Sequence, residues 1–170
     1  AGAEERYTAG LRIAERLAAA DPSNAESQRD LSVSYNRLGD VLRARGDLAG
    51  AEERYTAGLQ IRQRLAAADP SNAHSQRDLS VSYNRLGDVL VARGDLAGAE
   101  ERYTADLRIA ERLAAADPSN AESQRDLSVS YNKLGDVLRA RGDLDGAEEA
   151  ITRHQKIERQ IADNTSRSDG

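Results

Sequence analysis

The chain has 170 residues, a formal net charge of −5, and charged residues of both signs that make up 31% of the sequence. It contains no cysteine, which excludes disulfides and zinc–cysteine sites, and its acidic balance argues against a surface that binds nucleic-acid phosphates. No apolar run approaches the ~18 residues that a membrane-spanning helix needs, and no secretory signal is recognisable, so we expect a cytoplasmic protein without a membrane partner.

The first predicted element is a helix over residues 2–20, which also contains the first copy of a repeat. The segment AEERY begins at Ala3 and returns at Ala51 and Ala99, and the related AEEAI begins at Ala147, so successive copies lie 48 residues apart. A fixed period of this size indicates a solenoid whose units pack on their neighbours. We therefore expect a single array over residues 1–170, with three helical hairpins at about 23–68, 71–116 and 119–164 and a frayed tail at 165–170.

The first helix of each hairpin is predicted to start after an Asp-Pro-Ser-Asn segment. Ser23 and Glu26 have the spacing of a capping box, and His74 replaces the glutamate in the second hairpin, where we expect a weaker cap. Apolar side chains then recur at the spacing of one helix face, at Leu31, Tyr35, Leu38 and Leu42. This pattern predicts an amphipathic helix in each hairpin.

The tripeptide Arg45-Gly46-Asp47 comes next and recurs at residues 93–95 and 141–143. The same letters form an adhesion motif in some extracellular loops, but turn geometry accounts for every one of them here. Glycine suits the left-handed residue that ends a helix, aspartate the N-cap of the next helix, and arginine the negative end of the helix dipole. We therefore interpret the tripeptide as the connection between the two helices of a hairpin.

The second helix of each hairpin follows this turn. Glu52 and Glu53 are expected in its first turn, where the helix dipole favours carboxylates. Tyr55 and Leu59 supply part of its apolar side, and Asp69-Pro70 is expected to end it.

The order of these residues matches a known repeat signature. The pattern W-x2-L-G-x2-Y, then A-x3-F, then P, is matched by Tyr35-x2-Leu38-Gly39-x2-Leu42, then Ala51-x3-Tyr55, then Pro70. The chain therefore resembles the tetratricopeptide repeat (TPR) family, in a variant whose two helices have each gained about seven residues over the family period of ~34. The resemblance implies an all-α solenoid of about seven antiparallel helices in a right-handed superhelix, and a non-catalytic scaffold that binds other proteins.

In this family the concave face is formed mainly by the first helix of each hairpin. The residues expected on that face lie opposite the Leu/Tyr stripe, at Arg29, Asn36, Asp40, Arg43, Arg77, Asn84, Asp88, Arg125, Asn132, Asp136 and Arg139. There, asparagine would hold the backbone of a bound peptide or helix and arginine its carboxylates. Alternatively, the charges form Arg–Asp pairs between repeats and the face is only solvated.

The array is predicted to start and end on helices of the second type, so apolar surface is expected at its ends. End-to-end contact, and hence a possible homo-oligomer, is predicted through Tyr7, Leu11, Leu17, Ile151, Ile157 and Ile161.

No constellation of residues indicates an enzyme, a cofactor site or a metal site. The two histidines, His74 and His154, have no partners at a ligand spacing, and no glycine-rich phosphate loop or nucleophile motif is present. Two functions remain: a scaffold that binds a partner on its concave face, and a structural module, natural or designed, that self-assembles through its terminal helices. The near-identity of the repeats favours the module, whereas substitutions on the concave stripe in the second hairpin favour the scaffold.

Overall fold

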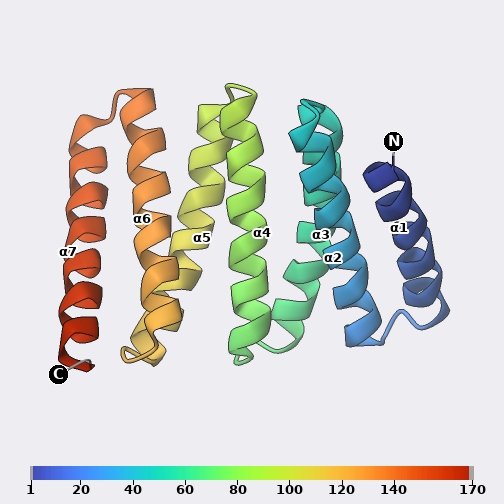
Figure 1. Cartoon of the computed structure of the whole chain (residues 1–170), viewed down its shortest axis with the longest axis horizontal. Coiled ribbons are helices and arrows are strands. Elements are labelled where there is room, and N and C mark those ends of the chain that lie inside the picture. The colour runs from blue at the N-terminus through green and yellow to red at the C-terminus, as the bar shows by residue number, and fades with distance from the viewer. Residues whose placement is uncertain (1, 169–170) are drawn as a thin grey trace.

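The computed structural model describes the backbone of residues 2–168 and the side chains of residues 2–164. This part of the chain forms seven α-helices and no strand: α1 (Gly2–Ala20), α2 (Ala25–Ala44), α3 (Leu48–Ala68), α4 (Ala73–Ala92), α5 (Leu96–Ala116), α6 (Ala121–Arg141) and α7 (Leu144–Ser168). The array runs from α1 at one end to α7 at the other, and each helix packs mainly on its neighbours in sequence (Figure 1). The protein is therefore an all-α solenoid, as predicted.

The Arg-Gly-Asp turns connect the two helices of each hairpin, as predicted. Gly46 has a left-handed backbone with φ +83°, and the N–H groups of Gly46 and Asp47 donate to carbonyls of the last turn of α2. These two bonds form a Schellman helix ending. The Asp47 carboxylate then accepts a hydrogen bond from the Gly50 N–H (2.9 Å) and caps α3. Gly94 and Gly142 repeat the left-handed conformation.

The caps at the start of the first helices differ from the prediction. The N-cap of α2 is Asn24, whose side chain accepts a hydrogen bond from a backbone N–H of the first turn (2.9 Å). Ser23 is not available because its N–H (3.1 Å) and hydroxyl (2.7 Å) both donate to Asp21. These bonds, that of the hydroxyl above all, lower the pKa of Asp21. Glu26 lies one residue too close to this cap to complete a capping box. The same cap recurs at Asn72 and Asn120.

The glutamates of the second helices also lie one turn later than predicted, because α3 begins at Leu48. Glu52 instead forms an ion pair with Arg93, the arginine of the next Arg-Gly-Asp turn. Equivalent pairs join Glu4 to Arg45 and Glu100 to Arg141. The arginine of each turn is therefore bound to the preceding repeat.

A glycine of the first helix allows the two helices of a hairpin to approach closely. Tyr55 of α3 is completely buried, and its ring lies against Gly39 of α2. A Cβ at Gly39 would lie 2.7 Å from the ring carbon Cε1, so this contact requires the missing side chain. Gly87 and Tyr103 repeat the contact in the next hairpin. The leucine–glycine pair of the repeat signature is therefore a packing element.

The C-terminal helix extends further than predicted. Residues 165–168, which were expected to fray, continue α7, while residues 169–170 lie outside the described part of the chain. Ile157 and Ile161 pack with Tyr131 in a cluster that holds this part of α7 on α6.

Candidate functional site

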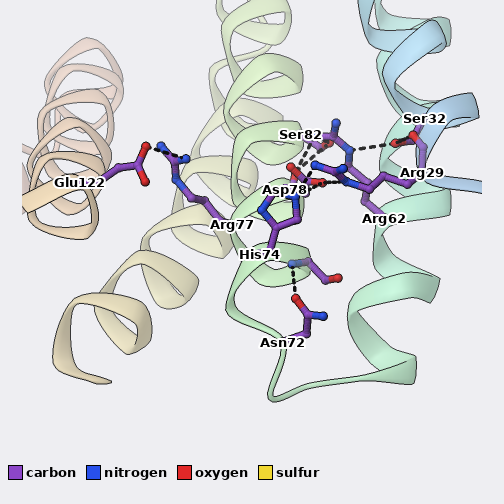
Figure 2. A network of polar contacts seen from close by, with 10 residues as sticks. Arg29, Ser32, Arg62, Asn72, His74, Arg77, Asp78, Ser82 and Glu122 are labelled. Atoms are coloured by element: carbon purple, nitrogen blue, oxygen red, sulfur yellow. Dashed lines mark hydrogen bonds and ion pairs between the residues drawn. The ribbon is translucent and has the colours of Figure 1, made fainter. Parts of the chain in front are cut away.

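The charged residues of the first helices pair from one repeat to the next. Arg29 of α2 contacts Asp78 of α4 (Nε–Oδ2, 2.8 Å), and Arg77 of α4 contacts Asp126 of α6 (Nε–Oδ2, 2.6 Å). Figure 2 shows Arg29 beside Asp78 and Arg77 directed at Glu122, with which it also pairs (2.8 Å). These arginines, predicted to hold the carboxylates of a partner, hold carboxylates of the next repeat.

The aspartates of the stripe are occupied in the first two hairpins. Asp40 accepts a hydrogen bond from the Tyr55 hydroxyl (2.7 Å) and forms an ion pair with Arg85 of the next repeat. Burial, together with the Asp40 carboxylate, raises the pKa of Tyr55 to about 12, so the phenol remains a donor at neutral pH. In the next hairpin the contacts of Asp88 are with Tyr103 (2.8 Å), Lys133 (2.6 Å) and Arg43 (3.6 Å).

The three asparagines of the stripe lie in different environments. Asn36 is 4% exposed and lies against Gly58 of α3, so the prediction that it contacts a partner is wrong. The cause is the close approach of the glycine, which brings the second helix over this position. Asn84 is half-buried and donates a hydrogen bond to Asp106 of α5. Asn132 is exposed and forms no hydrogen bond with the described residues.

Only on α6 are all the predicted residues exposed together, within the described chain. Arg125, Asn132, Asp136 and Arg139 are exposed, and their one mutual contact is the pair of Asp136 with Arg139 (3.7 Å). Two features explain this. Within the described residues no further first helix packs beyond α6, and Ile151 occupies the place of the tyrosine that would donate to Asp136.

A second polar system, which the sequence analysis missed, is buried between the hairpins. Each first helix carries two serines separated by one residue, such as Ser32 and Ser34 in α2. Arg62 of α3 is 6% exposed and donates to the hydroxyls of Ser32 and Ser82, on the helices before and after it (3.1 Å each; Figure 2). It also donates to the Asp78 carbonyl (2.7 Å), and burial lowers its pKa.

In the next repeat the same bridge has the opposite charge. Asp106 of α5 is completely buried and accepts hydrogen bonds from the hydroxyls of Ser80 on α4 and Ser130 on α6 (2.7 Å for Ser130). Asn84 donates to the second carboxylate oxygen. Burial raises the pKa of Asp106 to about 6, although the serine hydroxyls favour the ionised form.

On α7 the equivalent positions hold His154 and Glu158, and both contact the hydroxyl of Ser128 (2.7 Å for His154 Nδ1). The signal for these bridges was present in the sequence. Arg62 and Asp106 stand at two of the few positions where the nearly identical repeats differ. The role of these two residues becomes visible only in the packed structure, where their side chains face serines of the neighbouring helices.

The predicted contact residues of α1 divide into exposed and buried. Tyr7 is 39% exposed and Leu17 60%, whereas Leu11 is only 5% exposed because it packs within the array. Ile13, which was not predicted, is 51% exposed. The outer face of α1 is therefore apolar and open.

The predicted contact residues of α7 lie mostly within the fold. Ile157 is 7% exposed, and Ile151 and Ile161 are half-buried. Gln155, at the position of Leu59 and Leu107, is exposed. The two ends of the array therefore differ, with an open N-terminal helix and a largely polar outer side on the C-terminal helix.

Furrows between consecutive second helices form a third surface. One has a volume of about 600 Å³ and is lined by Leu59, Leu86 and Leu90, among others. The equivalent furrow one repeat later has a volume of about 300 Å³ and includes Leu107, Leu134 and Leu138. The sequence predicts apolar helix faces at these repeat positions, but it predicts neither furrow.

Among the side chains of residues 2–164, no three His, Asp or Glu come together in a group that could hold a metal ion. None of the described helices combines the length and apolar character needed to cross a membrane.

Comparison with known proteins identifies the repeat. A tetratricopeptide repeat model matches residues 31–70 and 79–118, and a second model of the same description matches residues 130–151. No curated protein matches the sequence. Similar solved structures include MamA (17% identity, TM-score 0.47, 92% of this chain and 91% of that chain), and BtubC from P. vanneervenii (16%, 0.33, 94% and 91%). A third is the de novo designed helical repeat protein DHR64 (13%, 0.37, 96% and 93%). Because the family models together match more than half of the sequence, the chain belongs to the tetratricopeptide repeat family.

Proposed function

We propose that this protein is a non-catalytic scaffold that binds a partner peptide or helix along the face of its first helices, with α6 as the main contact. The observation that carries the proposal is the exposure of Arg125, Asn132, Asp136 and Arg139 on one helix. The equivalent residues of α2 and α4 are largely occupied by pairs between repeats. A cytoplasmic location is part of the same proposal.

The chemistry of this surface defines the partner. Arg125 has no ion pair with the described residues and offers a planar guanidinium to a carboxylate. Asp136 and Asn132 offer acceptors to a cationic side chain or to backbone N–H groups of the partner. Asn132 also offers an amide donor to a backbone carbonyl. A partner segment with an acidic and a basic residue about ten residues apart on a helix would match them, since a helix rises 1.5 Å per residue.

The test is a selection of binders from a peptide library, followed by affinity measurements on charge-reversal variants of the full chain. Arg125→Glu should weaken binding by about tenfold or more, because a hydrogen-bonded charge pair contributes roughly 1.5–3 kcal/mol. Arg108→Glu on α5 serves as the matched control, because Arg108 is also exposed and has no ion pair with the described residues, and it should change affinity less than about twofold. Equal effects of the two substitutions would contradict the proposal.

A second candidate function is assembly through the ends of the array, and the open apolar face of α1 favours it. Light scattering over a concentration series tests this candidate. We expect association that is lost when Ile13 is replaced by glutamate, and a strictly monomeric chain would reject self-assembly.

A further inference from the structure

The junction of α3 with α4 lacks a carboxylate that the equivalent junctions on either side have. In those junctions the tyrosine of a first helix donates a hydrogen bond to a glutamate of the preceding second helix, in the pairs Tyr35–Glu15 (3.1 Å) and Tyr131–Glu111 (2.6 Å). In the middle junction Gln63 takes the place of the glutamate, and its Nε2 lies 3.0 Å from the hydroxyl of Tyr83. An amide is neutral in either orientation, so this junction has one negative charge fewer than its neighbours.

An arginine beside the middle junction has no acid to pair with. Arg102 of α5 and Gln63 of α3 line opposite walls of the furrow between these two helices. Arg102 is half-buried and forms no hydrogen bond or ion pair with the described residues, and its Nε atom is buried without a partner. Because a buried donor without an acceptor costs free energy, a ligand that supplies the acceptor is stabilised at this position.

The preceding repeat shows which group is missing. The Nε atom of Arg54, equivalent to that of Arg102, also lacks a hydrogen bond, but its guanidinium lies 3.7 Å from Glu53. Burial and the hydrogen bond to Glu15 raise the pKa of Tyr35, whereas the charge of Arg54 lowers it. The tyrosine of that repeat therefore interacts with both an acid and a base. In the middle repeat the base remains and the acid is absent.

The carboxylates that line the middle furrow do not replace this acid. Glu52 forms an ion pair with Arg93, and Asp95 caps the start of α5. Both lie at the end of the furrow next to the Arg-Gly-Asp turn, and Arg102 lies about two helical turns further along α5 than Asp95. Glu101 is exposed and forms no ion pair with the described residues.

The size and lining of the furrow suit a peptide. Its volume of about 600 Å³ lies within the range of ~300–1,000 Å³ that is usual for ligand pockets. The leucines of its floor are each less than 10% exposed, so polar groups must select the ligand. Thr56, Gln60 and Gln63 follow one another along the α3 wall, where they can donate to and accept from a peptide backbone. An acyl chain would leave these groups unpaired.

We propose that the furrow between α3 and α5 binds an extended, acidic segment of a partner protein, with Arg102 as the residue that holds its carboxylate. The segment is extended because only then are its own backbone groups free to bond with the α3 wall. Its carboxylate takes the place that Glu15 and Glu111 occupy in the neighbouring repeats. This surface lies among the second helices, so the proposal does not depend on the α6 surface.

The direct test is a titration of the full chain with a short peptide, followed by ¹⁵N NMR, which detects the Nε–H group of arginine. The probe is acetyl-Gly-Leu-Glu-Glu-Leu-Gly-amide, and its counterpart has glutamine in place of both glutamates. The Arg102 signal is identified by its loss in Arg102→Gln. We expect this signal to shift saturably with the acidic peptide and to respond at least tenfold more weakly to the neutral one, because a carboxylate makes the stronger hydrogen bond.

The substitution Gln63→Glu gives the middle junction the residue that its neighbours already have, so this variant is expected to fold. It places a carboxylate within the chain beside Arg102 and should weaken binding of the acidic peptide by about tenfold or more. Arg54→Gln is the matched control, since it removes the equivalent arginine from a junction that keeps its glutamate. It should change the affinity less than about twofold.

Four results would overturn the proposal: no saturable shift at millimolar peptide, equal binding of the two peptides, binding that Gln63→Glu leaves unchanged, or equal effects of Arg54→Gln and Arg102→Gln. Shifts confined to α6 would overturn it as well and support the scaffold surface described above. Failure of the α6 charge-reversal test leaves the Arg102 signal unaffected, so the two proposals can fail separately.

Discussion

The buried carboxylate of Asp106 should make the stability of this protein depend on pH in a predictable direction. Asp106 is completely buried between α4 and α6, and its charge is balanced only by hydrogen bonds from neutral groups and by the more distant Lys133. Replacing it with asparagine removes the titration, keeps an acceptor for Ser130 and Asn84, and presents an amide donor to the Ser80 hydroxyl, which can accept. The substitution Asp106→Asn therefore separates the cost of the buried charge from the value of the bridge.

The magnitude follows from the pKa of Asp106, which burial raises to about 6. In the unfolded chain an aspartate has a pKa of about 3.9. Between these values the folded protein keeps a proton that the unfolded chain has lost. The stabilisation linked to this proton is complete below the unfolded pKa and is lost as the pH rises through the folded pKa. At 1.36 kcal/mol per pKa unit, the loss is roughly 3 kcal/mol.

Urea denaturation followed by circular dichroism, at pH values from about 4 to 8, measures this effect. The free energy of unfolding of Asp106→Asn, minus that of the unsubstituted chain, should rise by roughly 2–3 kcal/mol over this range. The exposed Asp163, replaced by asparagine, provides a control whose difference should stay flat. A flat or falling difference for Asp106→Asn would refute the reasoning. It would mean that the serine and Asn84 donors hold the carboxylate ionised in spite of burial.

The other predictions concern local stability, and urea denaturation measures each of them. Gly39→Ala should cost about 1–3 kcal/mol because its Cβ overlaps the Tyr55 ring, whereas Gly10→Ala should stabilise α1 by up to about 1 kcal/mol; similar effects would contradict the role of Gly39. Asn24→Ala should cost about 1 kcal/mol through loss of the N-cap. A larger cost for Glu26→Ala would contradict this cap and support the Ser23–Glu26 capping box predicted from the sequence. Gly46→Ala should cost about 1–2 kcal/mol because of its positive φ, and a neutral result would show that the turn can rearrange.

The sequence predicted the helices and their connections well because local chemistry determines them. Gly46 and Asp47 end one helix and start the next through bonds within a few residues, and the period then repeats that turn. The error at Ser23 is also local. Asp21, two residues before it, competes for its hydroxyl, and spacing alone does not reveal this competition.

The surface of the first helices was predicted less well, because residues on the same side of a helix can differ in their exposure to solvent. Asn36 and Asp40 share one side of the helix, but the close approach at Gly58 buries Asn36 while Asp40 stays accessible to Arg85. Which charges pair depends on how far one hairpin is displaced against the next. That displacement is a property of the packed array, and the composition of a single unit does not contain it.

The paired serines of the first helices have a consequence for how such an array can change. A hydroxyl both donates and accepts, so the same helix can face Arg62, Asp106 or His154 without any change of its own. The buried polar group of a newly duplicated unit therefore finds a hydrogen-bond partner in the serines of the neighbouring helices, whichever unit lies beside it. Mutation can then alter the sign of the charge at one junction without a compensating mutation across it. Such tolerance at the junctions allows a chain to lengthen by copying whole units and to diversify afterwards.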